Sequence, residues 1–352
     1  MRLSAPHFQR AMLTWFDQHG RKHLPWQQNK TPYRVWISEI MLQQTQVTAV
    51  IPYFERFMQT FPDLPSLAAA SSDAVLHQWA GHGYYSRARN LHAAAQMVMQ
   101  EFAGKFPDTL EDLQKLPGIG RSTAGAILSI AFQQRATIMD GNVKRVLARY
   151  LGITDPVNEK AVENALWETA TELTPAKRSA DYTQAIMDLG ATLCTRSKPN
   201  CEQCPFVRDC VACAEDIVSE LPAKKATKKI PTRQATLLLV RHKGKILLCK
   251  RPTTGIWGGL WSLPEFSGEP DKKLLRQFCL QELGGAVGDF ETLASFRHTF
   301  SHYHLEIHPV IVTLARLPAK VMEAERQIWY NPSEPTAVGL PKPVQFLLSK
   351  LT

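Results

Sequence analysis

Two carboxylates, Glu39 and Asp140, stand in sequence contexts that favour opposite protonation states. Glu39 has apolar neighbours at helical spacing, Val35, Trp36 and Leu42, so desolvation is expected to raise its pKa and suit it to general acid catalysis. Asp140 precedes a helix at the N-cap position, where the helix dipole stabilises an ionised side chain. Such a pair predicts protonation of a leaving group by one carboxyl and stabilisation of a cationic sugar by the other. The plainer readings are a surface glutamate and a simple helix cap.

Four cysteines form a second chemical group, with the spacing C-x6-C-x2-C-x5-C: Cys194, Cys201, Cys204 and Cys210. Four thiolates on one short loop suit either a tetrahedral zinc ion or a four-iron cluster, and the spacing alone does not choose between them. The residues between them are polar, which argues against four unrelated core cysteines. Cys213 lies just beyond and is left outside the set. Because protein ligands would fill all four positions, we expect a structural or DNA-sensing centre and no hydrolysis there.

A helical hairpin is predicted ahead of Asp140. Leu116-Pro117-Gly118-Ile119-Gly120 forms a tight turn, in which Gly118 and Gly120 allow backbone amides to point outward. An apolar helix follows at once, and Thr109 to Asp112 read as a capping box that opens the helix before the turn. Free N–H groups at a helix N-terminus suit a phosphate, although an ordinary hairpin turn has the same pattern.

The elements that position these groups are helical throughout the first 221 residues. Helices are expected at 7–19, at 35–61 with a break near Pro52, at 66–79, from the turn at 81–85 to about 102, at 159–175 and at 178–194. Residues 222–234 carry five positive charges, no acidic residue and two prolines, which predicts a basic linker. Residues 235–352 alternate strand-like runs with helices, including a hairpin at Lys243-Gly244, so this part is expected to be α+β.

Charge and composition narrow the class of partner. The chain has 352 residues, a net charge of +9 and 44% hydrophobic residues, which fits about two globular domains and favours a polyanionic partner. Nucleic acid comes first and an anionic membrane surface second. The N-terminus lacks the apolar core of a signal peptide, and no run of about 18 apolar residues exists to span a membrane. We therefore expect a reducing, cytoplasmic compartment in which clustered cysteines bind metal.

The hairpin, the lone aspartate after an apolar run and the cysteine loop together resemble the helix-hairpin-helix DNA glycosylases of the endonuclease III superfamily. Four further stretches, SEIMLQQTQV, GHGYYSRARNLH, LPGIGRSTAGAI and MDGNVKRVLAR, are similar to the MutY-type adenine DNA glycosylase family. The resemblance implies an all-α glycosylase domain in 1–221, with a six-helix module at about 22–135 and an iron–sulfur module made of 1–21 and 136–221. It also implies a [4Fe–4S] cluster on the four cysteines.

The same resemblance assigns roles to the catalytic residues. Glu39 is expected to donate a proton to adenine N7 and then to help activate water, while Asp140, with Asn142 beside it, stabilises the cationic or covalent sugar intermediate. Ser122 stands where bifunctional relatives carry a lysine that attacks the sugar as an amine. A serine removes that Schiff-base route, so we predict a monofunctional glycosylase that leaves an abasic site.

Residues for DNA and base recognition also follow from the resemblance, because chemistry on a paired base requires its extrusion from the helix. Gln44, Thr45 and Tyr84 match residues that wedge into DNA or contact the base opposite, together with the Gly118–Gly120 turn. Leu42 is compatible with this role and equally with a core position. Three further residues match the adenine pocket: Arg21, Trp26 and Gln184. Asp188 is read as a buried structural carboxylate.

The second domain resembles a Nudix fold without its metal site. Trp257 to Phe266, WGGLWSLPEF, is similar to the loop before the Nudix box, but the following LLRQFCLQELGG has a single acidic residue, Glu282, where Mg²⁺ requires several. We expect a Nudix-like domain that no longer hydrolyses pyrophosphates and serves recognition. Cys249 and Cys279 are read as core residues.

A short loop in this domain, Phe300-Ser301-His302, matches the family's 8-oxoguanine recognition loop. Oxidation makes guanine N7 a donor, so the Ser301 hydroxyl could accept its proton. An alternative is a metal site on the alternating His302, His304, Glu306 and His308, to which we give little weight.

The resemblance implies an enzyme that hydrolyses the N-glycosidic bond of adenine paired with 8-oxoguanine or guanine. The expected partner is duplex DNA containing such a mispair, bound by a monomer without a membrane. Two alternatives remain: a thymine-glycol lyase of the endonuclease III type, against which Ser122 and the second domain argue, and a catalytically silent mismatch-binding module, against which Glu39 and Asp140 argue.

Overall fold

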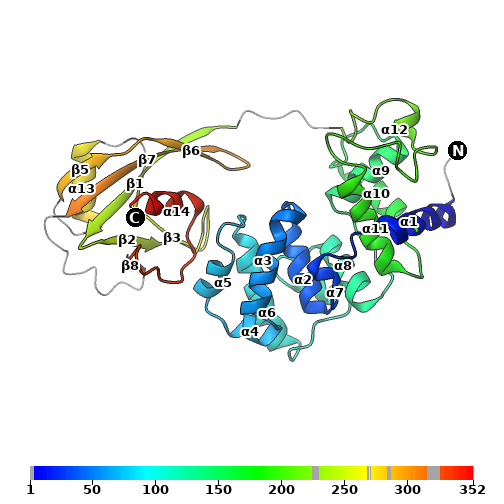
Figure 1. Cartoon of the computed structure of the whole chain (residues 1–352), viewed down its shortest axis with the longest axis horizontal. Coiled ribbons are helices and arrows are strands. Elements are labelled where there is room, and N and C mark those ends of the chain that lie inside the picture. The colour runs from blue at the N-terminus through cyan, green and yellow to red at the C-terminus, as the bar shows by residue number, and fades with distance from the viewer. Residues whose placement is uncertain are drawn as a thin grey trace. The chain divides into compact units, whose positions relative to one another are not determined.

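The computed structural model describes residues 4–223, 230–267, 269, 271–283, 287–314 and 326–351 (Figure 1). The chain forms two compact units, which are described separately. The first contains residues 1–69 and 90–227, and the second contains residues 70–89 and 228–352. Residues 224–229 of the expected linker lie outside the described residues, and the end of the expected linker, from Thr232, belongs to a strand.

The first unit is helical, as the sequence predicts (Figure 1). Its elements are α1 (Ala5–His19), the short 3-10 helix η1 (Pro25–Gln27), α2 (Pro32–Leu42), α3 (Val47–Thr60), α4 (Leu64–Ala69), α6 (Ser86–Glu101, of which the residues up to Arg89 belong to the second unit), α7 (Leu110–Lys115), α8 (Arg121–Phe132), α9 (Gly141–Leu151), α10 (Lys160–Leu173), α11 (Ser179–Thr192) and α12 (Val211–Ala214). Helix α8 packs against α2 and α11, and α11 also packs against α1 and α9.

Two predicted helix boundaries are wrong. The stretch 35–61 breaks at 43–46, between α2 and α3, where Gln44 adopts a φ of 56°, and Pro52 lies inside α3. Pro52 removes the helical partner of the Thr48 carbonyl, but the helix continues through it to Thr60. The single helix expected at 66–79 is two, α4 and α5 (Ser72–Gln78), because Ser71 caps a new helix by accepting the Ala74 N–H at 3.2 Å.

Helix α8 is fastened to the segment that leads to Asp140. The backbone of Gly125 comes so close that an added Cβ would lie 2.2 Å from the carbonyl oxygen of Thr137. The Ser122 hydroxyl accepts the backbone N–H of Met139 at 2.9 Å. The residue before Asp140 is therefore held directly against α8.

The second unit contains a mixed sheet with helix α5, the start of α6, α13 (Lys272–Glu282) and α14 (Lys342–Ser349). The main strand order is β3-β2-β1-β7-β5, with β4 on β1, β6 on β7 and β8 on β2. The strands are β1 (Thr232–His242), β2 (Lys245–Lys250), β3 (Trp261–Ser262), β4 (Glu265–Ser267), β5 (Val287–Thr292), β6 (Phe296–Thr299), β7 (His304–Leu314) and β8 (Gln327–Tyr330). Strands β1 and β7 are parallel, and the other pairings are antiparallel.

The sheet explains the hairpin and the core that the sequence predicts. Lys243 and Gly244, with φ of 44° and 76°, connect β1 and β2 in a two-residue turn. Alternate residues of β1 and β7 face α13, whose Leu275 and Cys279 join one buried cluster with Leu238, Val240, Val310 and Val312. Cys249 packs against the same cluster, so both cysteines of this unit lie in or beside the core.

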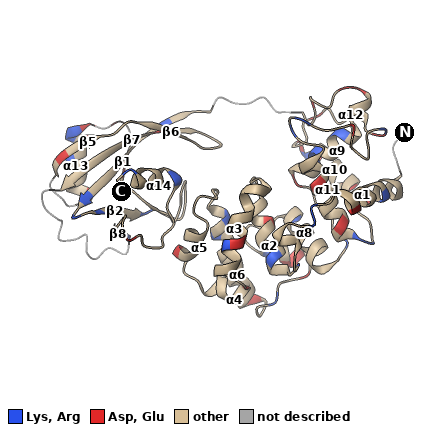
Figure 2. Cartoon of the chain, viewed as in Figure 1, with Lys and Arg blue, Asp and Glu red and all other residues tan. Residues whose placement is uncertain are grey.

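In the described part of the chain, no helix is long and apolar enough to cross a membrane. Lys and Arg outnumber Asp and Glu by 41 to 32, and the two signs are interspersed along both units (Figure 2).

Candidate active site

Helix α2 places Glu39 in an apolar environment. Thr31 caps the helix by accepting the Arg34 N–H at 3.3 Å, and Pro32 occupies its first turn. Most other residues of α2 are buried, including Val35 and Trp36, while Glu39 is partly exposed. Burial and, second, the negative charge of Asp140 raise the pKa of Glu39 from 4.5 to about 8. A carboxyl with this pKa is mostly protonated at neutral pH, as a general acid must be.

Asp140 is the N-cap of α9, in agreement with the sequence. Its side chain accepts the Val143 N–H at 2.7 Å and the Asn142 Nδ2–H at 3.2 Å. The net effect on its pKa nevertheless is upward, because burial outweighs these hydrogen bonds and the positive charge of Arg145. The hydrogen bonds that favour ionised Asp140 are therefore present, but the effect of desolvation on its pKa is larger.

The two carboxyls differ in what favours their ionised forms. Asp140 has backbone and side-chain donors and the nearby Arg145 charge, all of which favour its anion. For Glu39, both burial and the Asp140 charge favour the protonated form. We therefore expect Asp140 to ionise first and its charge to keep the proton on Glu39. This order makes Glu39 the carboxyl that keeps its proton longer and Asp140 the carboxyl that ionises more readily.

A chain of hydrogen bonds connects Asp140 with the cysteine loop. Asn142 donates to Asp140, and its Oδ1 accepts from Arg145 Nη2 at 2.7 Å. Arg145 also donates through Nε to the Cys194 carbonyl at 2.8 Å and through Nη2 to the Gly190 carbonyl at 2.7 Å. The sequence analysis did not predict this role of Arg145. Its position three residues after Asn142 on one helix does indicate that the two side chains can meet.

Two residues of the expected adenine pocket, Arg21 and Gln184, are hydrogen-bonded to the same carboxylate, that of Asp188. Asp188, fully buried, accepts from the Arg21 backbone N–H at 2.8 Å and from its guanidinium at 2.7 Å and 2.9 Å. Gln184 Nε2 also donates to Asp188, at 2.8 Å, and Gln184 Oε1 accepts from Gln27, which sequence reasoning missed. Trp26 is buried with its ring edge-on to Phe54. These contacts agree with a structural role for Asp188 and orient the Gln184 amide.

The residues expected to contact the opposite base are divided between the two units. Gln44 and Thr45, in the turn after α2, belong to the first unit together with the half-buried Leu42. The Gly118 turn also lies in this unit, with Gly118 at a φ of 81° and Gly120 as the N-cap of α8. Tyr84 belongs to the second unit.

Tyr84 is 48% exposed and has a φ of 46°. In the same unit, Phe300, Ser301 and His302 form the loop between β6 and β7. Tyr84 and the Phe300–His302 loop therefore both lie at turns between regular elements, where a side chain can reach a ligand.

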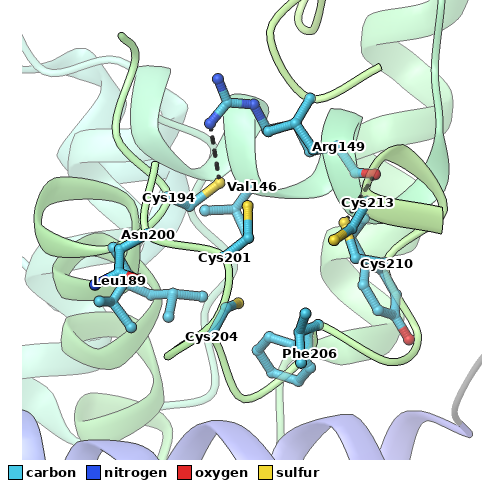
Figure 3. A pocket seen from close by; sticks show the side chains of 14 residues that line it. Val146, Arg149, Leu189, Cys194, Asn200, Cys201, Cys204, Phe206, Cys210 and Cys213 are labelled. Atoms are coloured by element: carbon cyan, nitrogen blue, oxygen red, sulfur yellow. Dashed lines mark hydrogen bonds between the residues drawn. The ribbon is translucent and has the colours of Figure 1, made fainter. Parts of the chain in front are cut away.

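The five cysteines of the loop line one cavity between α9, the end of α11 and α12 (Figure 3). Arg149, 2% exposed, enters from α9 and donates to Cys194 Sγ at 3.4 Å and to the Thr195 carbonyl at 2.7 Å. The four thiols of the expected set line this shared cavity with the buried Arg149 cation beside them, and they fit a thiolate-bound iron–sulfur group by the chemistry of the donor set. No three His, Cys, Asp or Glu residues of the described segments stand close enough to hold a single metal ion.

Two of the alternating residues of β7 have other partners, while the buried Nε2 of His308 has no hydrogen-bond partner among the described residues. His304 Nδ1 and the Thr299 hydroxyl lie 3.0 Å apart, and Glu306 pairs with Arg297 at 3.1 Å. In the loop before β7, the Ser301 hydroxyl lies 3.4 Å from His302 Nδ1. On α13, the positions facing the sheet carry Leu275 and Cys279, which build the core.

Replacing Glu39 by Gln is expected to stabilise the fold in a pH-dependent manner. The folded protein keeps a proton on Glu39 up to about pH 8, whereas the unfolded chain releases it near 4.5, so stability decreases as the pH rises through this window. The Tm advantage of Glu39→Gln should therefore grow over the window by several degrees, because each kcal/mol of lost stability lowers the Tm of a domain of this size by about 2–4 °C. Thermal melts of both proteins across this range measure it.

Glu163→Gln is the matched control, because Lys144 lowers the pKa of Glu163 through a 2.6 Å contact and the sign is opposite. A Tm difference for Glu39→Gln that stays constant with pH would contradict a raised pKa at Glu39.

Comparisons with known proteins match both parts of the chain. Residues 37–172 match the family described as HhH-GPD superfamily base excision DNA repair protein, and residues 235–350 match the NUDIX domain. A thermostable thymine-DNA glycosylase of known structure covers 60% of this chain and 97% of its own, with 27% identity and a TM-score of 0.54. Endonuclease III in complex with DNA, 21% identical with a TM-score of 0.52, covers 61% of this chain and 99% of its own and shows the same fold. The adenine DNA glycosylase of Buchnera aphidicola (subspecies Acyrthosiphon pisum) is 40% identical over 341 residues, which are 97% of this chain and 96% of that protein. The chain therefore belongs to the adenine DNA glycosylases, enzymes of base excision repair.

Proposed function

We propose that this glycosylase removes adenine paired with 8-oxoguanine or guanine in duplex DNA, that it is monofunctional, and that it leaves an abasic site. The observation that carries the chemistry is the pair of coupled carboxyls, in which the charge of Asp140 helps to raise the pKa of Glu39 to about 8. Protonated Glu39 donates its proton to adenine N7, and the glycosidic bond breaks with its electron pair passing to the base. Asp140 then faces the cationic sugar that remains.

Water completes the reaction. After its first proton transfer Glu39 is a carboxylate, so it can accept a proton from the water that attacks the anomeric carbon and return to its starting state. Asn142 and Arg145 hold Asp140 in place during both steps. Arg21, Trp26 and Gln184 form the proposed adenine pocket, in which Asp188 and Gln27 orient the Gln184 amide toward the base edge.

Ser122 supports the monofunctional assignment. Its hydroxyl accepts the Met139 N–H, and a serine offers no amine to form a Schiff base with the sugar. Strand cleavage by that route therefore has no nucleophile at this position.

A [4Fe–4S] cluster on Cys194, Cys201, Cys204 and Cys210 is the proposed cofactor. When bound, it supplies a rigid, electron-rich anchor for the loop. Support comes from the shared cavity, from the Arg149 donor to Cys194 and from the link through Arg145 toward Asp140.

The Nudix-like domain is proposed to recognise 8-oxoguanine through Phe300, Ser301 and His302. Duplex DNA with the mispair is the proposed partner, bound by a monomer. Tyr84, Gln44, Thr45 and Leu42 are proposed to contact or wedge beside the opposite base, with the Gly118–Gly120 turn on the phosphate backbone.

The central test is single-turnover adenine release from duplexes with adenine opposite 8-oxoguanine, guanine or thymine, read with and without alkali. We expect adenine release opposite 8-oxoguanine and guanine, and strand breaks only after alkali.

The Ser122→Lys variant tests the monofunctional assignment. It is expected to introduce strand breaks without alkali and an adduct that borohydride traps, whereas Ser122→Ala stays monofunctional. Strand scission by the unchanged protein would place it among the lyases, and mismatch binding without excision would leave a recognition module.

The pH dependence of the excision rate tests the roles of the two carboxyls. The rate should increase as Asp140 ionises and decrease above about pH 8 as Glu39 loses its proton, about tenfold per pH unit. Single-turnover rates at saturating enzyme, with DNA affinity measured at each pH, separate chemistry from binding. Glu39→Gln should bind the mispair and release no adenine. A rate that stays level well above pH 8 would exclude Glu39 as the acid.

Metal analysis of the purified full chain tests the cofactor. We expect about four iron and four acid-labile sulfide per chain. Cys204→Ser should lose most of both, while the matched variant Cys213→Ser keeps them, because Cys213 lies outside the proposed ligand set. One zinc ion per chain without sulfide would contradict the cluster.

A further inference from the structure

A segment of the helical half of the sequence, Ala70–Arg89, belongs to the second unit. Three side chains tie it to the Nudix-like residues. Asp73 pairs with Lys250 at 2.9 Å, His77 Nδ1 lies 3.2 Å from the Val338 carbonyl, and Arg89 Nη1 donates to the Gly258 carbonyl at 2.6 Å. The contacts are mixed in kind, with one ion pair and two bonds to backbone carbonyls, so they fix the segment in position and orientation.

This segment carries the turn that presents Tyr84. The Tyr85 hydroxyl accepts the Gly81 N–H at 3.2 Å and donates to the Leu340 carbonyl at 3.5 Å, while Trp79 Nε1 donates to the Gly83 carbonyl at 3.1 Å. Tyr84 itself has a φ of 46°, which non-glycine residues adopt only when their surroundings require it. The exposed position of Tyr84 therefore depends on contacts that include the Nudix-like loop at 338–340.

The turn Trp257–Gly259 lies on the other side of the Arg89 contact. Trp257 has a φ of 54°, and Gly259 has a φ of 76°. A Cβ added to Gly258 would lie 2.4 Å from the Thr253 carbonyl oxygen, and one added to Gly259 would contact Leu76 and Arg89 at 3.4 and 3.6 Å. A side chain at position 258 would clash with the Thr253 carbonyl, and position 259 has the positive φ that favours glycine. The backbone conformation of this turn is therefore tightly constrained.

The Trp257 side chain extends from the same turn to the proposed 8-oxoguanine loop. Its ring centroid lies 5.5 Å from that of Phe300 and 5.8 Å from that of His298. Arg251 stacks on Trp257 at 5.6 Å and is itself held by Glu265 at 2.6 Å. Trp257 is buried, so the ring supports Phe300 from within the fold and does not compete with it for a ligand.

We propose that the Trp257–Gly259 turn is a positioning element that sets the Tyr84 turn and the Phe300 loop in a fixed relation to each other. Its backbone carbonyl holds Arg89 and the Tyr84 turn, and its indole holds Phe300. Two elements that read one nucleotide, the base opposite the excised adenine, thus share one rigid support. The reading of that base rests on the proposed function, whereas the mechanical link between the two elements does not.

Hydrogen–deuterium exchange on the full chain without DNA tests the link. Arg89→Met removes the donor and keeps the apolar stem, and Trp257→Leu removes the indole. Each variant is expected to speed amide exchange at both 81–85 and 298–303, by about threefold to thirtyfold. Arg89→Lys, which keeps a cationic donor, should restore much of the protection. Arg178→Met, which breaks the ion pairs with Asp17 and Asp181 in the first unit, is the matched control and should leave both segments unchanged.

Exchange that increases only beside the mutated residue, in either variant, would overturn the proposal, because the turn would then support two independent elements. Thermal melts identify a variant that unfolds globally, and the milder Trp257→Phe then provides the comparison.

Excision assays separate this inference from the proposed function. The ratio of single-turnover rates opposite 8-oxoguanine and guanine should fall in Arg89→Met and in Tyr84→Ala, and the double variant should fall no further than the lower single variant. Additive losses would show that Arg89 does not act through Tyr84. If the unchanged protein showed no preference between the two bases while the exchange result held, the recognition assignment would fail and the mechanical link would stand.

Discussion

The half-buried carboxylate of Asp140 is the constraint on which the first unit depends. Removing a carboxylate from water is unfavourable unless donors replace the lost hydration. Here the donors are the first turn of α9, Asn142 and, one step further, Arg145. Arg145 in turn bonds to carbonyls at Gly190 and Cys194, so the cysteine loop and the end of α11 are fixed by the group that holds Asp140. A collapse of that loop would release Arg145 and leave Asp140 with fewer donors. The loop therefore has a structural consequence for the proposed catalysis without any chemistry at its sulfur atoms.

The same charge explains why two carboxyls are needed in one place. A single buried carboxyl has one pKa and cannot be both a proton donor and an anion at one pH. Placing two together raises the pKa of the one with weaker compensation, which is Glu39. Burial raises the pKa of both, so the difference arises from the N-cap hydrogen bonds and Arg145, which only Asp140 has. The hydrogen bonds at the helix N-terminus therefore decide which of the two carboxyls keeps its proton longer.

Features with local causes could be predicted from the sequence. The cap at Asp140, the two-residue hairpin at Lys243-Gly244, the helical and α+β halves and the family all follow from short patterns. Features that depend on partners far along the chain could not. The break at Gln44 in place of Pro52, the bond from Arg145 to a carbonyl 49 residues away and the Asp188 network around Arg21 each require knowledge of the packed neighbours. The placement of Ala70–Arg89 with the second unit is the largest such case, because nothing in its own sequence distinguishes it from the neighbouring helices.

The second unit combines a match to the NUDIX domain with a core-building helix. Leu275 and Cys279 on α13 now face the sheet as core residues, and the metal carboxylates of a Nudix hydrolase are missing from this helix. The loop before the helix nevertheless keeps a demanding backbone, with Trp257 at positive φ and Gly258 packed against Thr253. A strained turn without metal chemistry to serve would tend to relax under mutation, since strain lowers stability. Its contacts with Arg89 on one side and Phe300 on the other supply a reason for its shape, which is the proposed positioning of the Tyr84 turn and the Phe300 loop.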